Sequence, residues 1–273
     1  MKFDMGRAWN DAVALVSANR HVVPVIAGVF FFLPSFAMAL LLPGQMADLQ
    51  AANGNPAAAW RAMGAFYERI WWAILLVAVV QGIGMLGLLA LLTDRSRPTV
   101  GEALAIGAKA LIPYIVAQFL QALSFVLVFA ILVGIGAATG SKGITALLVL
   151  VAIVAAAYIF TKFSLTIPVI AIERVMNPVR ALARSWRLTK GNSVRLFVFY
   201  LLLLIVLMVV AMLLSAIFGL VGVAFGAAGA SIVSGVVSAL MNMTFVMMLL
   251  AVLAAVHRQL SGPSEQNLSE TFE

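Results

Sequence analysis

The sequence predicts an all-α, polytopic membrane protein with six transmembrane helices and three cytoplasmic amphipathic surface helices. Three observations predict this fold class: a very apolar composition, six apolar runs of membrane-spanning length, and an uneven distribution of cations between the two sides of these runs. Of 273 residues, 64% are hydrophobic and only 10% are charged, and the mean hydropathy is +1.12. A soluble domain carries about 25% charged residues because water must solvate its surface. This chain therefore requires lipid as its solvent.

The six apolar runs predict the spans directly. They lie at residues 22–42, 69–93, 111–137, 144–170, 196–222 and 231–256. A helix rises 1.5 Å per residue, so about 20 residues cross the hydrocarbon core, where a helix satisfies its own backbone polar groups. Because Asp4 and Asp11 precede the first run, we interpret it as a retained span rather than a cleaved signal peptide. We expect one transmembrane domain over residues 1–260 and a disordered cytoplasmic tail over residues 261–273.

Lysine and arginine residues lie mostly on one side of the predicted spans. With the N-terminus inside, only Arg61, Arg69 and Lys142 of the 17 lysines and arginines fall on the outer side. Cytoplasmic loops are enriched in these residues, so we expect both termini in the cytoplasm. The net charge of +7 and the sequence pI near 10.3 are interpreted in the same way. They indicate orientation and contact with anionic headgroups rather than nucleic-acid binding.

Three segments on the predicted inner side show helical spacing of apolar residues and indicate surface helices. Thr99-Val100-Gly101-Glu102 has the pattern of a capping box, and Asn177 followed by Pro178 is typical of a helix start. Each segment leads into a pair of spans, which predicts a threefold repeat of surface helix, span and span. The apolar positions are Trp9, Ala12, Val13 and Val16 in the first segment, Val100, Ala103, Leu104 and Gly107 in the second, and Val179, Leu182, Ala183 and Trp186 in the third.

The inner segment after the fourth run contains a distinctive pattern. Pro168 and Glu173 precede a stretch that contains Ala-Leu-x-x-Ser-Trp-x-Leu-x-x-Gly from Ala181 to Gly191, followed by Asn192. This pattern resembles the membrane domain of the glycerophosphoryl diester phosphodiesterase membrane-domain family, and is similar to related bacterial inner-membrane proteins of unknown function. The hydropathy of the remaining chain fits that family more loosely.

The resemblance implies a helical domain in the bacterial inner membrane, which in some relatives is fused to a soluble phosphodiesterase barrel. The catalytic signature of such a barrel should include a His-Arg-Gly start, acidic metal ligands and a second histidine. Here His257-Arg258-Gln259 departs from that start, and only a short tail follows it. The resemblance therefore implies membrane residence and a lipid-related setting, without the phosphodiesterase activity.

Residues for catalysis are scarce. His21 and His257 lie at predicted inner ends of spans, where we interpret them as interfacial residues, and the ten carboxylates are scattered. The absence of cysteine excludes disulfides, thiolate nucleophiles and cysteine-ligated metals. We expect no enzymatic activity, no metal and no cofactor. The spaced glycines, such as Gly136 with Gly140 and Gly222 with Gly226, indicate close helix packing.

Four polar residues in the predicted spans are candidate intramembrane sites: Gln118, Gln121, Lys162 and Asn242. Polar side chains at membrane depth usually face a cavity or a neighbouring helix. Lys162 lies about two turns from the inner boundary, so it can extend to the interface as an anchor or serve in transport. The two glutamines and Asn242 can bond neighbouring helices or bind a substrate.

The third surface segment is the candidate lipid-headgroup site. Arg180, Arg184 and Arg187 recur at helical spacing beside the apolar stripe. Cations at this depth attract anionic headgroups, and Trp186 suits an interface because its ring is apolar while its N–H needs a polar partner. The same arginines can also act only by enforcing topology, and the sequence leaves both interpretations open.

Two functions follow from these observations. The first is a non-catalytic integral inner-membrane module that is lipid-associated, a scaffold or an oligomer. The second is a transporter or lipid permease with a polar cavity between the helices. Transporters usually show broken helices or charges at the midplane, and no charge is predicted there, which favours the first function. The expected partners are membrane lipids with anionic headgroups and a second copy of the chain, but no nucleic acid.

Overall fold

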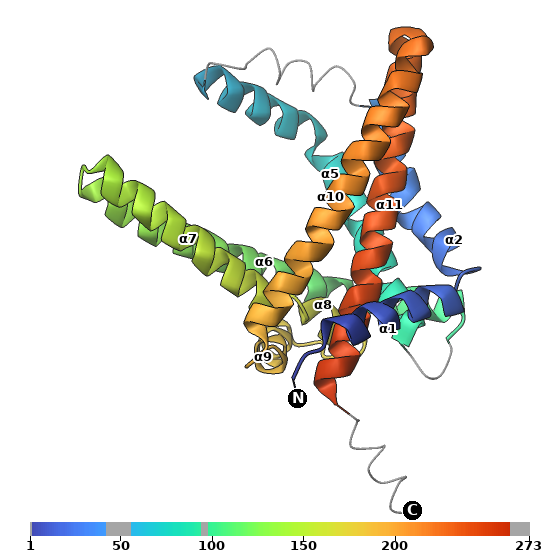
Figure 1. Ribbon diagram of the computed structural model, residues 1–273, viewed down its shortest axis with the longest axis horizontal. Coiled ribbons are helices and arrows are strands. Elements are labelled where there is room, and N and C mark those ends of the chain that lie inside the picture. The colour runs from blue at the N-terminus through green and yellow to red at the C-terminus, as the bar shows by residue number, and fades with distance from the viewer. Residues whose placement is uncertain (1, 42–55, 94–97, 263–273) are drawn as a thin grey trace, which may run out of the picture. The chain divides into compact units, whose positions relative to one another are not determined.

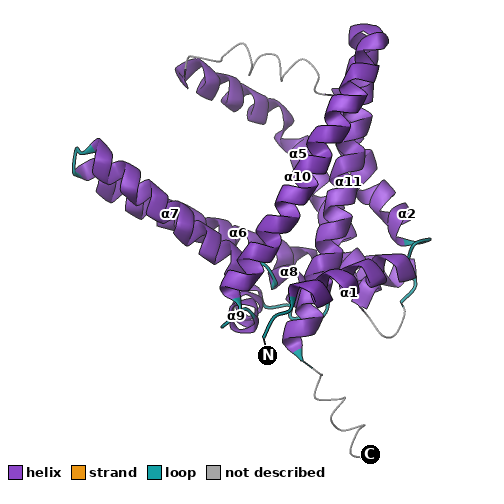
Figure 2. Ribbon diagram, in the orientation of Figure 1, coloured by secondary structure: helices purple, strands orange, loops and turns teal. Residues whose placement is uncertain are grey.

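The computed structural model describes residues 2–41, 56–93 and 98–262, and the regular elements within these ranges are all helices (Figures 1 and 2). Residues 42–55, residues 263–273 of the predicted tail, and the cations Arg95 and Arg97 lie outside the described residues. The elements are α1 (Met5–Ala18), α2 (Val23–Ala27), the π-helical turn η1 (Gly28–Phe32), α3 (Leu33–Leu41), α5 (Pro56–Thr93), α6 (Val100–Ala138), α7 (Lys142–Phe163), α8 (Thr166–Ala171), α9 (Pro178–Leu188), α10 (Ser193–Ala224) and α11 (Gly226–Ser261).

Within the described residues, six helical stretches are long and apolar enough to cross a membrane, and they correspond in order to the six predicted runs. Their bounds are Val23–Leu40, Ala57–Thr93, Val100–Ala138, Lys142–Ala171, Ser193–Ala224 and Gly229–Ser261. The predicted all-helical fold with six candidate spans is therefore confirmed. The second and third stretches begin well before the predicted runs. In both cases the preceding residues are mostly good helix formers and contain no proline after the first helical residue, so the helix starts early and continues into the span.

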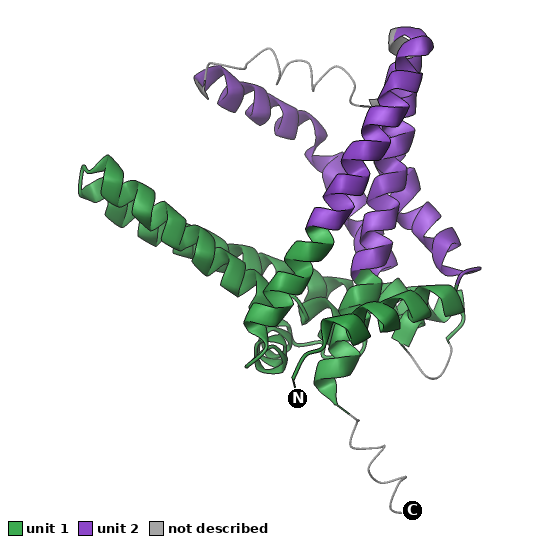
Figure 3. Ribbon diagram, in the orientation of Figure 1, with its two compact units in different colours: residues 1–19, 86–204, 250–273 green, residues 20–85, 205–249 purple. Residues whose placement is uncertain are grey.

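The chain divides into two compact units (Figure 3). Unit 1 comprises Met1–Asn19, Leu86–Leu204 and Leu250–Glu273, and unit 2 comprises Arg20–Met85 and Ile205–Leu249. Three of the four boundaries between the units fall within α5, α10 and α11, and the other falls between α1 and α2. Unit 1 contains all of α1, α6, α7, α8 and α9, and unit 2 contains α2, η1 and α3.

In unit 1, α6 and α7 form an antiparallel hairpin. A Cβ atom at Gly136 would lie only 2.9 Å from the Cα of Thr145, so only glycine permits this approach. The connection contains Gly140 at a φ of +66°, which glycine adopts without strain. The predicted close packing at Gly136 is confirmed. In unit 2, a Cβ atom at Gly84 would overlap the side chain of Phe30, so the helices meet closely there as well.

Two of the three predicted surface helices are separate elements. α1 is capped by Asp4, whose side chain accepts from the Arg7 N–H, and α9 starts at Pro178 as predicted. The second is not separate. The capping box of Thr99 and Glu102 is present, but the helix continues without interruption to Ala138. Pro113 lies inside this helix and does not end it. The threefold repeat stays a prediction.

Candidate functional site: the α9 surface and the polar groups behind it

α9 has defined ends. The Asn177 side chain accepts a hydrogen bond from the Arg180 N–H at 3.0 Å, and Pro178 occupies the first helical position, where its missing N–H costs nothing. After the helix, Gly191 has a φ of +83°, a left-handed conformation that lets the chain turn toward α10. The local sequence therefore specifies an 11-residue helix between the fourth and fifth spans.

The buried face of α9 supplies hydrogen-bond partners at a break in the fourth span. The fourth span breaks at Ser164 and Leu165, between α7 and α8, and Pro168 contributes because it has no N–H for the carbonyl four residues earlier. The Ser185 hydroxyl donates to the Lys162 carbonyl at 2.7 Å and accepts from the Leu165 N–H at 3.2 Å. Backbone groups in such surroundings must be paired. Ser185 thus supplies the partners that the break removes.

The packed face of α9 is small and partly polar, and it differs from the predicted apolar stripe. Of that stripe only Leu182 is buried, whereas Val179, Ala183 and Trp186 are exposed. The reason is that the hydroxyls on the packed face bond backbone at the broken span, so polar residues replace apolar ones there. That the exposed stripe enters the acyl boundary stays a prediction. The buried residues of α9 and its C-cap are Ala181, Leu182, Ser185, Leu188 and Thr189.

The outward face of α9 carries most of the predicted headgroup residues. Arg180, Arg187 and Lys190 are exposed, and Val179 and Trp186 beside them are 62% and 38% exposed. These residues combine three cations with apolar side chains on one surface. This is the pattern of a helix that lies at a membrane interface.

Arg184 occupies a different environment. Its Nε donates to both carboxylate oxygens of Glu173, at 3.0 and 3.2 Å. The same carboxylate lies 2.9 Å from Nε2 of His257 on α11, whose side chain is only 6% exposed. Glu173 therefore joins α9 and α11 within unit 1. The predicted headgroup row consequently contains one arginine that is already bound to a carboxylate.

The electrostatics of Glu173 follow from these two partners. Burial by itself would raise the pKa of this carboxyl group. Hydrogen bonds from His257 and Arg184, together with their positive charges, outweigh burial and hold the pKa below its ordinary value. The carboxylate is thus kept ionised as a link between two helices. The sequence shows an ionisable residue at each of these three positions, but it gives no indication that they meet, because His257 is 84 residues from Glu173.

Hydrogen bonds and an ion pair between described residues hold α1 and the residues before it against the rest of unit 1. The Phe3 N–H donates to the Asn192 side chain at 2.9 Å, and Asp11 pairs with Arg258 of α11 at 2.8 Å. The Phe3 ring packs edge-on against Phe199 of α10, with centroids 5.5 Å apart. The N-terminal surface helix is therefore joined to two spans, which no local pattern in the sequence indicates.

The candidate residues Lys162, Gln118 and Gln121 all lie in unit 1. Lys162 is buried, and its Nζ lies over the rings of Tyr158 and Trp186. Gln118 and Gln121 are half-buried on α6, and Gln118 donates to the hydroxyl of Tyr114 one turn earlier. This is a hydrogen bond within one helix, so for Gln118 the structure shows no bond to a neighbouring span.

Asn242 belongs to unit 2, where it makes a hydrogen bond between helices. Its side-chain amide donates to the Ser35 hydroxyl of α3 at 2.8 Å, and Gln81 of α5 donates to the same oxygen at 3.4 Å. Three helices therefore meet at one hydroxyl within the spans. Hydrogen bonds of this kind commonly join membrane helices. Ser35 and Gln81 are polar residues of the first and second predicted runs. The sequence alone does not indicate that they lie next to Asn242.

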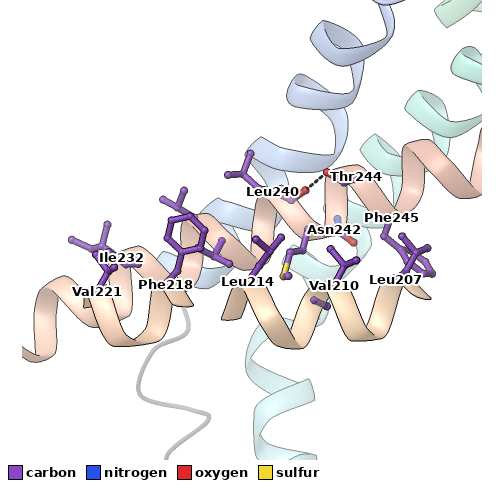
Figure 4. Close-up of a pocket in the computed structure, with 15 residues that line it drawn as sticks. Leu207, Val210, Leu214, Phe218, Val221, Ile232, Leu240, Asn242, Thr244 and Phe245 are labelled. Atoms are coloured by element: carbon purple, nitrogen blue, oxygen red, sulfur yellow. Dashed lines mark hydrogen bonds between the residues drawn. The ribbon is translucent and has the colours of Figure 1, made fainter. Parts of the chain in front are cut away.

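Asn242 also lines an apolar groove between α10 and α11 in unit 2 (Figure 4). The groove has a volume of about 640 Å³. Asn242 and Thr244 are its polar residues, and the Thr244 hydroxyl is bonded to the carbonyl of Leu240. The other walls are apolar side chains such as Leu214 and Phe218. Gln118 and Gln121 do not line it, so the polar cavity expected from the sequence does not correspond to this groove.

The fold and these sites define a multi-pass helical membrane protein. Residues 135–261 match the family model for the membrane domain of glycerophosphoryl diester phosphodiesterase, and the resemblance predicted from the motif after Pro168 is confirmed. The matched segment includes α7 to α11. No curated protein and no solved structure matches the chain. The match is to a membrane domain, and the described residues contain no catalytic domain and no group of three or more histidine and acidic side chains placed to hold a metal.

Proposed function

We propose that this chain is a non-catalytic module of the bacterial inner membrane, with both termini in the cytoplasm, that binds anionic lipid headgroups on the outward face of α9. The observation that carries the proposal is the exposure of Arg180, Arg187 and Lys190 beside the exposed Val179 and Trp186. Each cation near an anionic surface contributes about 1 kcal/mol. Two cations on α9 and a third, Lys190, two residues after its end therefore favour anionic over zwitterionic lipid.

The anchoring of α9 supports this role. Because Ser185 bonds the broken span and Arg184 bonds Glu173, the helix is held in one orientation without using its outward cations. A surface whose orientation is already determined loses less entropy when a lipid binds than a mobile segment does. The outward cations are thus available to headgroups at little cost in protein order.

The test uses purified protein in nanodiscs or neutral detergent, with phosphatidylglycerol or phosphatidylcholine added. The variant R180Q/R187Q/K190Q retains the Arg184–Glu173 pair and should bind phosphatidylglycerol more weakly, by up to about 100-fold at low salt, with less difference at high salt. The matched control R61Q/R69Q/K142Q removes three exposed cations from the predicted outer side and should bind like the wild type. Equal loss in both variants, or no loss in the first, would contradict the proposal.

A second function, a lipid permease, is supported by one observation. The groove between α10 and α11 is apolar and large enough for part of a lipid, and Ala211 lies in its wall. The two functions differ in a reconstituted vesicle assay with a fluorescent lipid. Under the favoured proposal, vesicles with protein translocate lipid no faster than empty vesicles. Faster translocation that A211W abolishes would favour the permease.

A further inference from the structure

Lys162 is a cation enclosed by aromatic side chains. It lies in the last turn of α7, immediately before the break in the fourth span, and only 3% of the residue is exposed. Its Nζ lies 5.3 Å from the ring centroid of Trp186 and 5.4 Å from that of Tyr158. Trp186 also contacts Phe163, with centroids 5.6 Å apart. The ammonium therefore faces two aromatic rings, which attract a cation through their negative faces.

No carboxylate of the described residues pairs with this charge. Among the described residues, no carboxylate lies within 4.0 Å of the Lys162 Nζ. The described carboxylates that have partners bond elsewhere: Glu173 binds Arg184 and His257, Asp11 binds Arg258, and Asp4 and Glu102 cap their own helices. A buried charge without an ionic partner is costly. The two rings offset this cost only in part, since a cation–π contact contributes about 1–2 kcal/mol.

One wall of this enclosure, Trp186, also belongs to the face that we propose to bind lipid. Trp186 belongs to α9 and is 38% exposed, and it adjoins Arg187 in the sequence. A lipid headgroup held at Arg187 would therefore lie next to the residue whose ring covers Lys162. Lysine binds phosphate as a point charge with three donors.

We propose that Lys162, Tyr158 and Trp186 form a phosphate-binding site that takes the phosphate of an anionic membrane lipid. The proposal rests on the proposed function, because α9 must lie at the headgroup layer for the lipid to reach the site. The Lys162 ammonium donates to a phosphate oxygen, and the two rings exclude water and pack against the adjoining glycerol and acyl carbons. The outward cations attract anionic lipid in general, whereas this site binds one phosphate in a defined position.

The test compares K162M with the wild type, with K142M as the matched control, because Lys142 is exposed on the predicted outer side. In lipid-free neutral detergent, K162M should be at least as stable as the wild type, because the substitution removes a buried unpaired charge. Phosphatidylglycerol should then raise the melting temperature of the wild type and of K142M but not of K162M. The apparent affinity of the saturable site should fall about tenfold or more in K162M, as expected for a lost charge-assisted hydrogen bond.

The outcomes separate this inference from the proposed function. If K162M is stabilised by phosphatidylglycerol like the wild type while R180Q/R187Q/K190Q is not, the phosphate site is refuted and the proposed function stands. If the triple variant binds like the wild type and only K162M loses binding, the outward cations are refuted and the site stands. A third arm adds inorganic phosphate to lipid-free protein. Stabilisation there that is lost in K162M, without any from the lipid, would overturn the assignment to a lipid.

Discussion

Replacement of Ser185 by alanine tests how α9 is held on the membrane domain. In the wild type, the Ser185 hydroxyl donates to the Lys162 carbonyl at 2.7 Å and accepts from the Leu165 N–H at 3.2 Å. The residue is fully buried, so water cannot replace the lost hydroxyl without moving α9. The variant therefore leaves one carbonyl and one N–H without their partner at the break in the fourth span.

The expected destabilisation follows from those two groups. A buried polar group that loses its partner costs about 1–3 kcal/mol. The Thr189 hydroxyl lies 3.5 Å from the Lys162 carbonyl and can move to replace part of that bond, so the loss falls in the lower part of the combined range, about 2–4 kcal/mol. One kcal/mol shifts the melting temperature by about 2–4 °C in domains of 150–250 residues. The variant should melt about 4–16 °C below the wild type.

The assay is thermal denaturation in one neutral detergent at one scan rate, because unfolding of such proteins is commonly irreversible. The matched control is Ser234→Ala on α11, since Ser234 is exposed and its hydroxyl bonds only the carbonyl of Ser231 in its own helix. The control should melt within about 2 °C of the wild type. If S185A and S234A melt together, α9 is not held by this hydroxyl, and the account of the broken span is refuted.

Three further predictions concern other parts of the chain. The pKa of Glu173 is lowered in the folded protein, so its contribution to stability is present above pH 4.5 and is lost as the pH falls through the lowered value. The wild type should therefore lose thermal stability on acidification below about pH 4.5. E173Q should have a lower melting temperature than the wild type at pH 7 and should lose less of it on acidification. Single cysteines test topology in this cysteine-free chain: an impermeant thiol reagent applied to intact cells should label N53C and not S264C, and the reverse pattern would invert the predicted orientation. Ser35→Ala removes the shared acceptor of two interhelical hydrogen bonds. It should lower the melting temperature by only a few degrees, because such bonds average about 0.6 kcal/mol in membrane proteins. A drop as large as that of S185A would contradict this expectation of a small effect.

The spans and the helix starts could be predicted from the sequence because both depend on neighbouring residues. Membrane crossing requires about 20 consecutive apolar residues, and that length is visible without any knowledge of the fold. The cap of Asn177 and the box of Thr99 and Glu102 involve groups only three residues apart. The prediction of a separate second surface helix was wrong, because the apolar spacing indicates where that helix starts but not where it ends. Nothing after Gly107 ends the helix, so the second surface segment continues into its span.

The packed face of α9 could not be predicted, because the hydrophobic pattern indicates the wrong residues. A stripe containing Val179 and Trp186 is the most apolar side of the helix, yet the side that packs contains Ser185 and Thr189. The face that packs is set by the Lys162 carbonyl at the break in the fourth span, and Lys162 is 23 residues away from Ser185 in the sequence. The Glu173–His257 pair depends on an even longer separation. One sequence read alone contains no information about such pairs.

The motif that carries the family resemblance specifies one residue that orients α9 and leaves two of the outward cations unspecified. Ser185 bonds the broken span and Trp186 covers Lys162, and both are specified in the pattern Ala-Leu-x-x-Ser-Trp-x-Leu-x-x-Gly. Arg187 and Lys190 occupy unspecified positions of that pattern and are exposed. The motif therefore contributes the serine that orients the helix, and two of its open positions carry exposed cations. Under the proposed function, substitutions at Arg187 and Lys190 change lipid binding without changing how α9 is held, whereas a substitution at Ser185 first lowers stability.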